Sequence, residues 1–594
     1  MATTEVGTHG SGLFSVQNLP ASTVEGSARR AALEELERAA EHVSPTSLVG
    51  YASGGHVLLV GPSAGPLLDA AERLGEELPR VVLAPDAEGR KRGSLTVLRG
   101  ELCSLRGYLG EFDARLATPQ AEEPVQAPSV AELADDRRNG FDLVLDFHET
   151  PWIPYPVPPI GYFPVGRHPE QLERALEQAP DLVGEFEKPT YFAYDADLCA
   201  HGARNQRGCT RCIDTCPSGA ITSIGEWIEV DPNLCQGVGI CVSTCPSGAL
   251  TYAYPRPADL LEGIREALRA YRQAGGEHPV ILLHDEEGGL ERLAEVAGRL
   301  PENVIPVAVE EVGSVGMDVW FAATAYGASR VALLGTHRLA CSVRGEQPRQ
   351  IGFAEAILGG LGLPERVVWI AADDDEALTR LGEEPGGEGF SGSVPRPATF
   401  WTFNEKRGTI RFALQHLQDQ VGTPEEPLPL PEGAPFGNVQ VDQEACTLCL
   451  ACASVCPTRA ISDGGDEAPR ISFTEDLCVQ CGLCDSACPE DAITLEPRFL
   501  YDWEARRAPR VLYEEQPFHC IRCGVAFGTQ SGIERMMDRL SGHSMFESET
   551  DLERLKMCGD CRVKDLFQEE MGGLEERRKP KVFGMSEDSG SRYS

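Results

Sequence analysis

Residues 446–457 read Cys-Thr-Leu-Cys-Leu-Ala-Cys-Ala-Ser-Val-Cys-Pro, and residues 478–489 read Cys-Val-Gln-Cys-Gly-Leu-Cys-Asp-Ser-Ala-Cys-Pro. Both stretches have the spacing Cys-x2-Cys-x2-Cys-x3-Cys-Pro. In this spacing a tight turn lets three thiolates bind one iron–sulfur cluster, while the fourth, before proline, binds the neighbouring cluster. A zinc site or disulfides would leave unexplained why the spacing occurs twice with proline in register.

The two stretches together predict two cubane clusters, each with three ligands from one run and one from the other. The first cluster is assigned to Cys446, Cys449, Cys452 and Cys488. The second cluster is assigned to Cys478, Cys481, Cys484 and Cys456.

The chain resembles bacterial two-cluster ferredoxins over residues 436–500. Besides the cysteine spacing, Ala460-Ile461 follows the first Cys-Pro at the distance at which Ala492-Ile493 follows the second. This is the internal duplication of that family. The resemblance implies a small α+β domain in which two helices and two short hairpins enclose a pair of [4Fe-4S] clusters. It implies one-electron transfer as the chemistry.

A second pair of runs, closer to the N-terminus, departs from this pattern. Counting back from Cys216-Pro217 gives Cys212 and Cys209, but Gln206 stands where the first cysteine is expected. Cys199 is the nearest thiol upstream, and the loop that separates it from Cys209 is long enough to return to the cluster. We therefore expect a third [4Fe-4S] cluster, with the ligands Cys199, Cys209, Cys212 and Cys245.

In the partner run, Val238 occupies the position of the second cysteine, and a valine side chain cannot ligate iron. The ligands that remain for this fourth site are Cys235, Cys241 and Cys216. Loss of this particular ligand resembles ferredoxins that hold a [3Fe-4S] cluster. We expect a [3Fe-4S] cluster or a [4Fe-4S] cluster with a labile corner; the alternative is a degenerate site without metal.

A further group of cysteines lies near the C-terminus, where two Cys-x2-Cys knuckles are formed by Cys520, Cys523, Cys558 and Cys561. Four thiolates suit structural zinc. A single iron is the alternative, because Cys523-Gly524 resembles the knuckle of rubredoxins. Helical spacing of Ile533, Met536, Met537 and Leu540 predicts a helix that packs over the metal site. Cys103 and Cys341 have no partner motif and are expected to be buried.

Length and charge limit the class of protein. A chain of 594 residues is expected to hold three to five domains. The formal charge of −39 argues against nucleic acid as a partner. It favours steering toward a basic face of a redox partner protein; adaptation to a salty habitat is the alternative explanation. No stretch approaches the roughly 20 apolar residues of a membrane span. With no export signal and many thiols predicted to bind metal, we expect a cytoplasmic protein.

Two regions alternate short apolar runs with helical patterns, which is typical of parallel α/β layers. The first has apolar runs at 56–60, 81–84, 95–98 and 143–145. Its Gly61-x3-Gly65 lacks the third glycine of a nucleotide site, and flavin is not indicated. The second has apolar runs at 280–283, 304–309, 331–334 and 367–371, and its stretch His284–Glu287 is expected to be a solvated acidic loop.

The second of these regions resembles the small α/β module of methyl-viologen-reducing hydrogenase delta subunits and of heterodisulfide reductase flavin subunits. The likeness rests on Val315-Gly-Met-Asp318 before a helix and on Ala325-Tyr-Gly327-Ala328 before the strand at 331–334. The cysteines that bind that module's own cluster are missing. The resemblance implies a docking or relay scaffold.

The fold class predicted from these features is multidomain α/β plus α+β, with two dicluster ferredoxin-like domains and two parallel-sheet modules. The predicted segments are an N-terminal helical segment (1–45), an α/β module (46–190), a degenerate dicluster domain (191–256), an α/β module (257–380), a linker-rich segment (381–435), a dicluster ferredoxin domain (436–500), a four-cysteine zinc-type region (501–575) and a disordered tail (576–594).

Taken whole, the chain resembles large bacterial ferredoxin-type proteins encoded alongside formate dehydrogenase. The strings that carry this resemblance are Gly184–Pro189 before Tyr191-Phe192, Cys199-Ala-His201 with Gly208-Cys-Thr-Arg-Cys212, and Arg535-Met-Met with Gly542–Phe546. The resemblance implies an accessory electron carrier rather than a catalytic subunit. Two other hypotheses stay open: a flavin-containing oxidoreductase subunit, and an iron–sulfur assembly factor for a redox enzyme.

Overall fold

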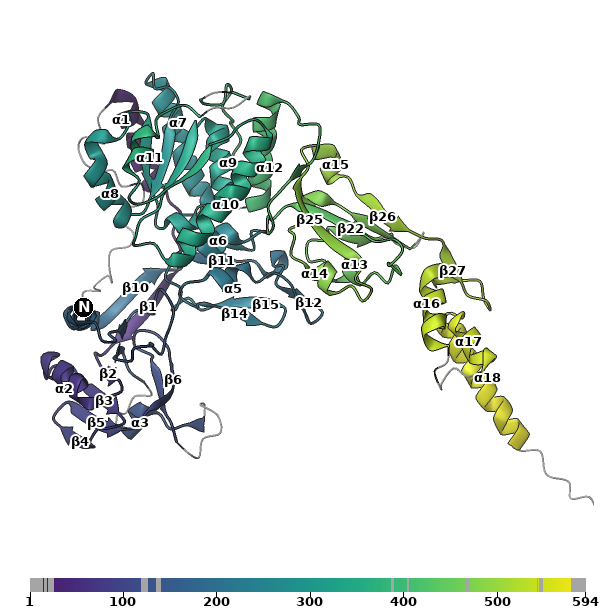
Figure 1. Ribbon diagram of the computed structural model, residues 1–594, viewed down its shortest axis with the longest axis horizontal. Helices are drawn as coiled ribbons and strands as arrows, with labels where there is room; N and C mark the ends of the chain where they lie inside the picture. The colour runs from purple at the N-terminus through teal and green to yellow at the C-terminus, as the bar shows by residue number, and fades with distance from the viewer. Residues whose placement is uncertain are drawn as a thin grey trace, which may run out of the picture. The chain divides into compact units, whose positions relative to one another are not determined.

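The computed structural model describes residues 14, 19, 26–118, 126–134, 140–385, 389–390, 392–402, 405–464, 469–541, 543 and 548–577 (Figure 1). The chain divides into two compact units. The first unit runs to Gly437 and includes Val479–Cys481 and Pro497–Trp503; the second comprises Asn438–Cys478, Gly482–Glu496 and the chain from Glu504 onward. The predicted disordered tail lies outside the described residues except for its first two positions.

The first α/β layer of unit one is a six-stranded sheet of order β4-β5-β3-β2-β8-β9, parallel except for β4. The apolar runs of the sequence form its central strands, so the predicted parallel layer is confirmed. The elements of this region are β2 (Val57–Val60), α2 (Ala64–Arg73), β3 (Arg80–Ala84), β4 (Arg90–Arg92), β5 (Leu95–Arg99), β6 (Leu102–Arg106), β7 (Asp113–Leu116), α3 (Val130–Leu133), β8 (Leu143–Asp146), β9 (Tyr162–Pro164) and α4 (Pro169–Gln178). Strands β6 and β7 form a separate two-stranded sheet.

A two-stranded antiparallel ribbon leads from this layer toward the first cysteine runs. β1 (Leu48–Ser53) pairs with β10 (Gly184–Pro189). The chain then forms the elements of the first cluster domain. These are β11 (Phe192–Tyr194), β12 (Gly202–Ala203), β13 (Gln206–Arg207), α5 (Arg211–Thr215), β14 (Ile221–Ile224), β15 (Trp227–Val230), α6 (Ile240–Thr244) and β16 (Leu250–Tyr252).

The second α/β layer of unit one has a four-stranded parallel sheet of order β18-β17-β19-β20. Its strands are buried throughout or nearly so, as expected of a sheet covered on both faces. Its elements are α7 (Pro257–Gln273), β17 (Val280–His284), α8 (Gly288–Val296), β18 (Val304–Ala308), α9 (Met317–Tyr326), β19 (Arg330–Leu334), α10 (Cys341–Gly360), β20 (Val367–Ile370) and α11 (Asp375–Arg380).

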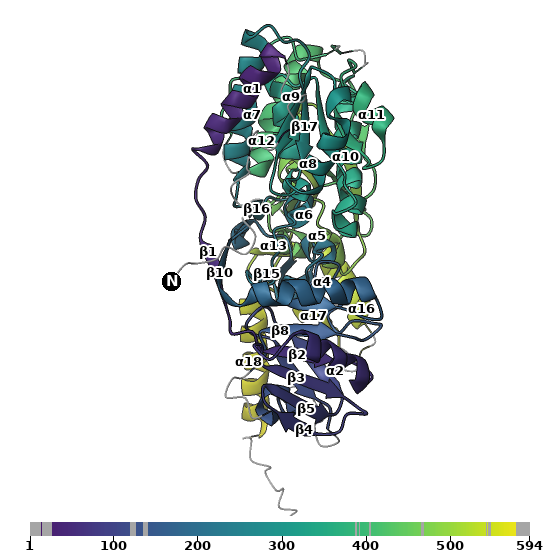
Figure 2. The same cartoon turned by 90° about the vertical axis from the view of Figure 1, so that its left-hand side faces the viewer.

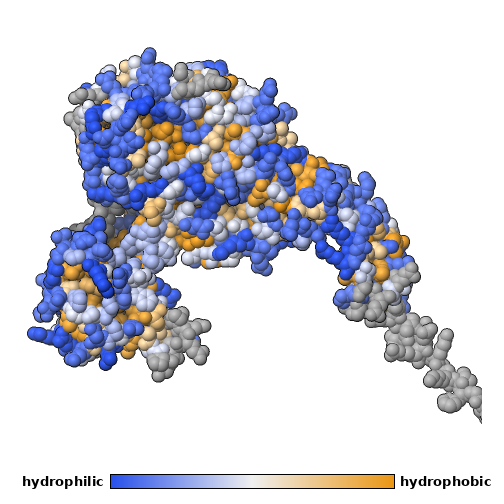
Figure 3. All heavy atoms as spheres, viewed as in Figure 1, coloured by the Kyte–Doolittle hydropathy of each residue, from blue (hydrophilic) through white to orange (hydrophobic). Residues whose placement is uncertain are grey.

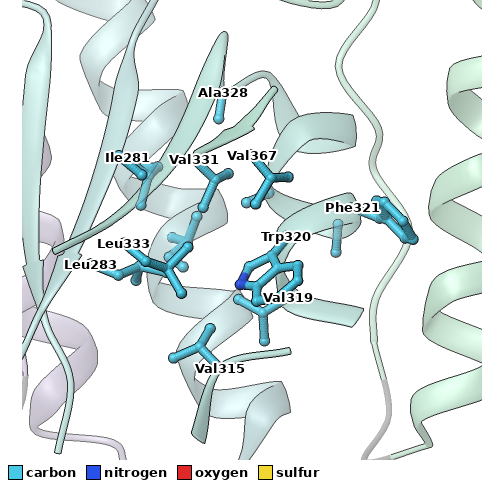
Figure 4. Close-up of a cluster of buried hydrophobic side chains, with 14 of the residues drawn as sticks. Ile281, Leu283, Val315, Val319, Trp320, Phe321, Ala328, Val331, Leu333 and Val367 are labelled. Atoms are coloured by element: carbon cyan, nitrogen blue, oxygen red, sulfur yellow. The ribbon is translucent and has the colours of Figure 1, made fainter. Parts of the chain in front are cut away.

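The core of this layer is centred on Trp320 of α9, which is fully buried. Figure 4 shows Trp320 close to apolar side chains of the strands, among them Val331 and Leu333. α9 is buried on all sides and is apolar except for Asp318 and Thr324, as expected of a helix that is covered on every face.

Two helices outside the predicted bounds of this module also belong to its core. α1 (Ser27–Ala40) packs along α7 and buries Ala32, Leu33 and Leu36 (Figure 2). The predicted N-terminal helical segment is thus a helix of the middle module. α12 (Lys406–Val421) lies inside the predicted linker-rich segment and packs on α9.

The reason for the second difference lies in the sequence of α12. Glu405 caps the helix by accepting hydrogen bonds from the backbone N–H groups of Arg407 and Gly408. Ile410, Leu414 and Leu417 then repeat at helical spacing and are buried. The proline-rich composition around α12 obscured this pattern.

The acidic stretch His284–Glu287 also differs from the expectation of a solvated loop. His284 ends β17 and is fully buried, and Asp285 is 7% exposed. One Asp285 carboxylate oxygen accepts hydrogen bonds from the backbone N–H groups of Glu287 and Gly289, at 3.1 and 3.0 Å. Asp285 therefore shapes the turn that starts α8.

Unit two contains the second cluster domain and the C-terminal cysteine region. Its surface and that of unit one carry many hydrophilic side chains on the face shown in Figure 3. None of the helices in the described ranges is long and apolar enough to cross a membrane. The elements are β22 (Gly437–Val441), α13 (Ala451–Val455), β23 (Ile461–Asp463), β24 (Arg470–Phe473), α14 (Leu483–Ser486), β25 (Ile493–Phe499), α15 (Trp503–Arg507), β26 (Arg510–Glu514), β27 (Pro517–His519), β28 (Ala526–Thr529), α16 (Gln530–Leu540), α17 (Glu549–Leu555) and α18 (Gly559–Arg577).

Candidate iron–sulfur and metal centres

Three of the four cysteine runs share one backbone turn. The second and fourth residues after the first cysteine of each run have positive φ: Leu448 and Leu450 (51° and 59°), Gln480 and Gly482 (52° and 83°), and Gly237 and Gly239 (75° and 74°). A non-glycine residue in this region costs about 1–2 kcal/mol. The two leucines and the glutamine are therefore held in a strained turn, as expected where a functional group needs close approach of several ligands.

The run that contains Val238 keeps this turn although it has lost a cysteine. The run that ends at Cys216 does not keep it, because the hairpin of β12 and β13 is inserted where the first cysteine is missing. All four runs nevertheless end alike. The third residue after each Cys-Pro cysteine has positive φ: Gly219 (64°), Gly248 (82°), Arg459 (55°) and Asp491 (50°).

The first predicted cluster of unit two has its four cysteines close together. Burial is the main cause that raises the pKa of Cys452 to about 12; a hydrogen bond from the backbone N–H of Ala453 opposes it, and the negative charges of Cys446, Cys449 and Cys488 add to it. Backbone N–H groups point at two of the sulfurs: Leu448 donates to Cys446 Sγ at 3.4 Å and Ala492 to Cys488 Sγ at 3.3 Å. Crowded buried thiolates with N–H donors fit a group that brings positive iron.

Three of the four cysteines predicted for the second cluster in this region belong to unit two. Cys456, Cys478 and Cys484 belong to unit two, whereas Cys481 belongs to the short piece Val479–Cys481 of unit one. Within unit two, the backbone N–H of Ile461 donates to Cys456 Sγ at 3.5 Å. The grouping of these four ligands stays a prediction from their spacing.

In the first cluster domain, Cys199 lies near the three cysteines that it is predicted to join. Burial raises the pKa of Cys212, and the charges of Cys245, Cys209 and Cys199 add to this effect. The loop returns because two backbone hydrogen bonds close it. The N–H of Gly208 donates to the carbonyl of His201 at 2.7 Å, and the N–H of Cys209 donates to that of Ala200 at 2.9 Å.

The three cysteines of the Val238 site are also neighbours. Burial raises the pKa of Cys241 well above its usual value, and the charges of Cys235 and Cys216 are the next largest causes. The carbonyl of Val238 lies so close to Gly313 that a Cβ there would be 2.4 Å from its oxygen. The second α/β layer thus packs directly on the run in which Val238 replaces a cysteine.

A cavity of about 600 Å³ lies on the Val238 side of this run. It borders residues that follow β17, β18 and β19, at the carboxyl ends of the parallel strands. Six acidic residues and two basic residues line it: Glu187, Asp285, Glu286, Glu287, Glu310 and Glu311, together with Lys188 and Arg338. Burial raises the pKa of Glu311 well above its usual value, and the charge of Asp285 adds to this effect.

The C-terminal cysteines form a compact tetrad. The sulfurs of Cys520, Cys523, Cys558 and Cys561 all lie within 4.8 Å of one another, and among the described residues no other group of three or more potential ligands meets this limit. The sulfurs of Cys523 and Cys558 are 3.7 Å apart. A tetrahedron with metal–sulfur bonds of about 2.3 Å has edges of about 3.8 Å, so the tetrad fits one ion.

The knuckles come from two different elements. Cys520 and Cys523 lie in the turn between β27 and β28, whereas Cys558 and Cys561 lie at the start of α18. Although burial raises the pKa of Cys520, hydrogen bonds from the backbone N–H groups of Cys558, Cys523 and Arg522 lower it to about 6. A low pKa favours the thiolate, which is the form that binds metal.

Other sequence predictions in this region have mixed outcomes. The helix predicted from Ile533, Met536, Met537 and Leu540 is α16, but Ile533 is its buried residue while Met536 is 38% exposed. Of the two cysteines outside the motifs, Cys103 is half-buried and Cys341 is exposed. The expectation that both are buried is wrong for Cys341, which begins α10 on the surface, and is met only in part by Cys103.

Sequence reasoning missed two buried lysines beside the first cluster domain, Lys188 and Lys406. The sequence offered one signal for these lysines: lysine is rare in the chain, with only seven, and arginine occupies most of the basic positions. The contacts themselves are not visible in the sequence, because the partners are 47 and 161 residues away.

Comparison with protein families agrees with this geometry. Residues 439–462 and again 471–494 match a family described as a 4Fe-4S binding domain. Residues 181–249 match a family described as a 4Fe-4S dicluster domain. The chain therefore carries ferredoxin-type domains. These domains support an iron–sulfur protein with an electron-transfer role. Among curated proteins, none matches the chain.

Proposed function

We propose that this protein relays single electrons through three or four iron–sulfur clusters between a redox enzyme and an acceptor. The observation that carries the proposal is the pair of ferredoxin domains, in which three of four cysteine runs adopt the same strained turn. Bound clusters supply one-electron chemistry without bond making. The polypeptide supplies thiolates, N–H donors and burial. The resemblance in sequence makes formate dehydrogenase the first candidate for the enzyme.

The proposed cluster content follows the ligand sets. Full sets of four cysteines support three [4Fe-4S] clusters, of which the one with Cys199 depends on the inserted loop. The Val238 site supports a [3Fe-4S] cluster or a [4Fe-4S] cluster with a labile corner. The tetrad of Cys520, Cys523, Cys558 and Cys561 supports one structural zinc, because its sulfurs are too close together to enclose a cluster core.

The cavity beside Val238 raises the alternative of a flavin-containing subunit. Ligands of open α/β sheets bind at the carboxyl ends of the strands, where this cavity lies. Its six acidic side chains, however, outnumber its two basic ones, Lys188 and Arg338, which disfavours the phosphate of a flavin nucleotide. We therefore propose a carrier without flavin. Flavin in the supernatant of the denatured protein would contradict this.

Reversible redox cycling tests the proposal. Protein reconstituted without oxygen should be bleached by a chemical reductant and should regain its visible absorbance on reoxidation over several cycles. An assembly factor should instead lose iron to an apo-ferredoxin that is added in excess. Irreversible bleaching, or transfer of most of the iron to the apo-ferredoxin, would contradict an electron carrier.

A further inference from the structure

Two buried lysines contact the backbone of the cysteine runs in the first cluster domain. Lys188 lies on β10, before the first cysteine run, and Lys406 is the first residue of α12 in the second α/β layer. Each is 7% exposed. A buried ammonium group is costly unless hydrogen bonds and negative charge compensate it. Both lysines have such partners.

Lys406 binds the end of α6. Its Nζ donates hydrogen bonds to the carbonyls of Val242, Ser243 and Cys245, at 2.9, 2.8 and 2.9 Å. All three N–H donors of the ammonium are thereby used. Its Cβ packs on Gly248, where a side chain would come within 2.9 Å of it. The absence of a side chain at Gly248 thus lets Lys406 approach the Cys-Pro end of the run.

Lys188 binds the other run in a similar way. Its Nζ donates to the carbonyl of Asn233 at 3.0 Å and to that of Cys235 at 2.6 Å. The same ammonium lies 5.1 Å from the ring centre of Tyr51, whose hydroxyl also donates to the Asn233 carbonyl, at 2.7 Å. The loop before Cys235 is therefore held by a cation from another part of the chain.

Each lysine also has its own set of negatively charged groups nearby. Burial lowers the pKa of Lys188 to about 8, and the charges of Cys235 and Asp231 oppose this. Burial also lowers the pKa of Lys406, and the charges of Asp318 and Cys245 oppose it. Each lysine thus interacts with one cluster cysteine. By the predicted ligand sets, Cys245 belongs to the four-cysteine cluster and Cys235 to the Val238 site.

From this we infer that Lys406 and Lys188 are positioning residues that fix the backbone of Cys245 and Cys235 and raise the reduction potentials of their respective clusters. The inference rests on the proposed electron-carrier function. Reduction adds one electron, and hence one negative charge, to a cluster without making or breaking bonds. A cation held beside the ligand stabilises the reduced form more than the oxidised form. Neutral side chains could bind the carbonyls, but they could not do this.

Potentiometric titration followed by electron paramagnetic resonance tests the inference on full-length protein. Lys406→Met should lower the potential of the cluster ligated by Cys245, and Lys188→Met should lower that of the Val238 site. Lys→Arg variants at the same positions keep the charge and should stay near the parent potential. The cluster predicted for Cys446, Cys449, Cys452 and Cys488, all of which belong to unit two, serves as the unshifted reference.

Two results would overturn the inference: unchanged potentials in both Met variants, or equal shifts of all clusters. If a Met variant loses its cluster, the matching Arg variant decides. A retained cluster at the parent potential supports the role of charge, and loss of the cluster there as well contradicts it. Clusters that do not cycle reversibly even in the parent protein would instead contradict the proposed function.

Discussion

Val238 is the residue on which the proposed iron content of the first cluster domain depends. Its run keeps the left-handed turn at Gly237 and Gly239, so the backbone that would present a cysteine is still formed. Only the sulfur is missing. The turn therefore predicts that a cysteine at this position would find the geometry of a ligand already in place.

Val238→Cys should convert the site to a stable [4Fe-4S] cluster. The iron content should rise by about one per chain, and the resonance of an oxidised three-iron centre should disappear. Val157→Cys is the control, because Val157 borders the same cavity but lies outside the cysteine runs. An unchanged iron content and spectrum in Val238→Cys would show that the site does not hold a cluster of this kind.

In the first α/β layer, Asp146 is a buried hydrogen-bond acceptor at the end of β8. It is fully buried and accepts hydrogen bonds from the Tyr162 hydroxyl, from the Trp152 N–H, and from the N–H and ring of His148, at 2.5, 2.8, 3.0 and 2.6 Å. Burial alone would raise the pKa of Asp146. The hydrogen bonds outweigh burial and lower this pKa.

Asp146→Asn should destabilise this layer by about 2–3 kcal/mol, because bonds to a charged acceptor are lost. Faster hydrogen exchange at β8 and β9 measures this; Asp69→Asn, at an exposed site on α2, is the control. The lowered pKa gives the sign of the pH dependence. The contribution is complete above the unfolded pKa of aspartate and is lost as pH falls through the folded value. A variant as stable as the parent at neutral pH would refute this account.

At this scale the sequence allowed prediction of ligands but not of their surroundings. The ligand sets could be predicted because three cysteines of each set lie close together in the sequence. The inclusion of Cys199 in the third set stays a prediction. Lys406 and Lys188 act through the backbone of distant residues, so no spacing rule could connect them to Cys245 or Cys235.

Among the elements, α12 shows most clearly where composition misled the prediction. The proline-rich sequence that surrounds it is typical of linkers, yet the helix packs against α9. Strands β17 to β20, in contrast, were readable as apolar runs because a sheet covered on both faces needs continuous apolar sequence. Helices with one apolar face give a weaker signal.

Leu417→Ala should destabilise the second α/β layer by about 2–5 kcal/mol, because Leu417 is fully buried and its removal leaves a cavity. Denaturant unfolding monitored by Trp320 fluorescence or by hydrogen exchange at β19 measures the change. Asp419→Ala, at an exposed position of the same helix, should have little effect. Equal stability of the two variants would mean that α12 is a linker helix after all.

The hairpin of β27 and β28 and the helix α16 connect the cysteine tetrad to a cluster ligand loop. Thr529 donates a hydrogen bond to the carbonyl of Thr447 at 3.0 Å, and Arg535 donates to the carbonyls of Ala445 and Glu444. These three carbonyls lie in or beside the loop from Cys446 to Cys449. Through these hydrogen bonds, a metal bound by the tetrad should stabilise this loop.

Cys558→Ser should remove about one zinc per chain and leave the cluster iron bound. Because the hairpin loses its metal, hydrogen exchange should accelerate at β27 and β28 and also around Thr447. Cys341→Ser is the matched control, since Cys341 is exposed and belongs to no motif. Recovery of iron in place of zinc at the tetrad would instead favour the rubredoxin-like alternative.

At the scale of the whole molecule, the predicted segment boundaries do not always match the groups of elements that pack together. α1 belongs to the second α/β layer although the first layer follows it in the chain. Sequence patterns identify an element by its neighbours and cannot show which distant element covers it. The number of modules that fold independently therefore stays a prediction.

The measurement that tests the central claim most directly is the count of iron, acid-labile sulfide and zinc per chain after reconstitution without oxygen. Three [4Fe-4S] clusters and one [3Fe-4S] cluster predict about 15 iron and about 16 sulfide, together with about one zinc. Colourless protein without iron and sulfide would contradict the account.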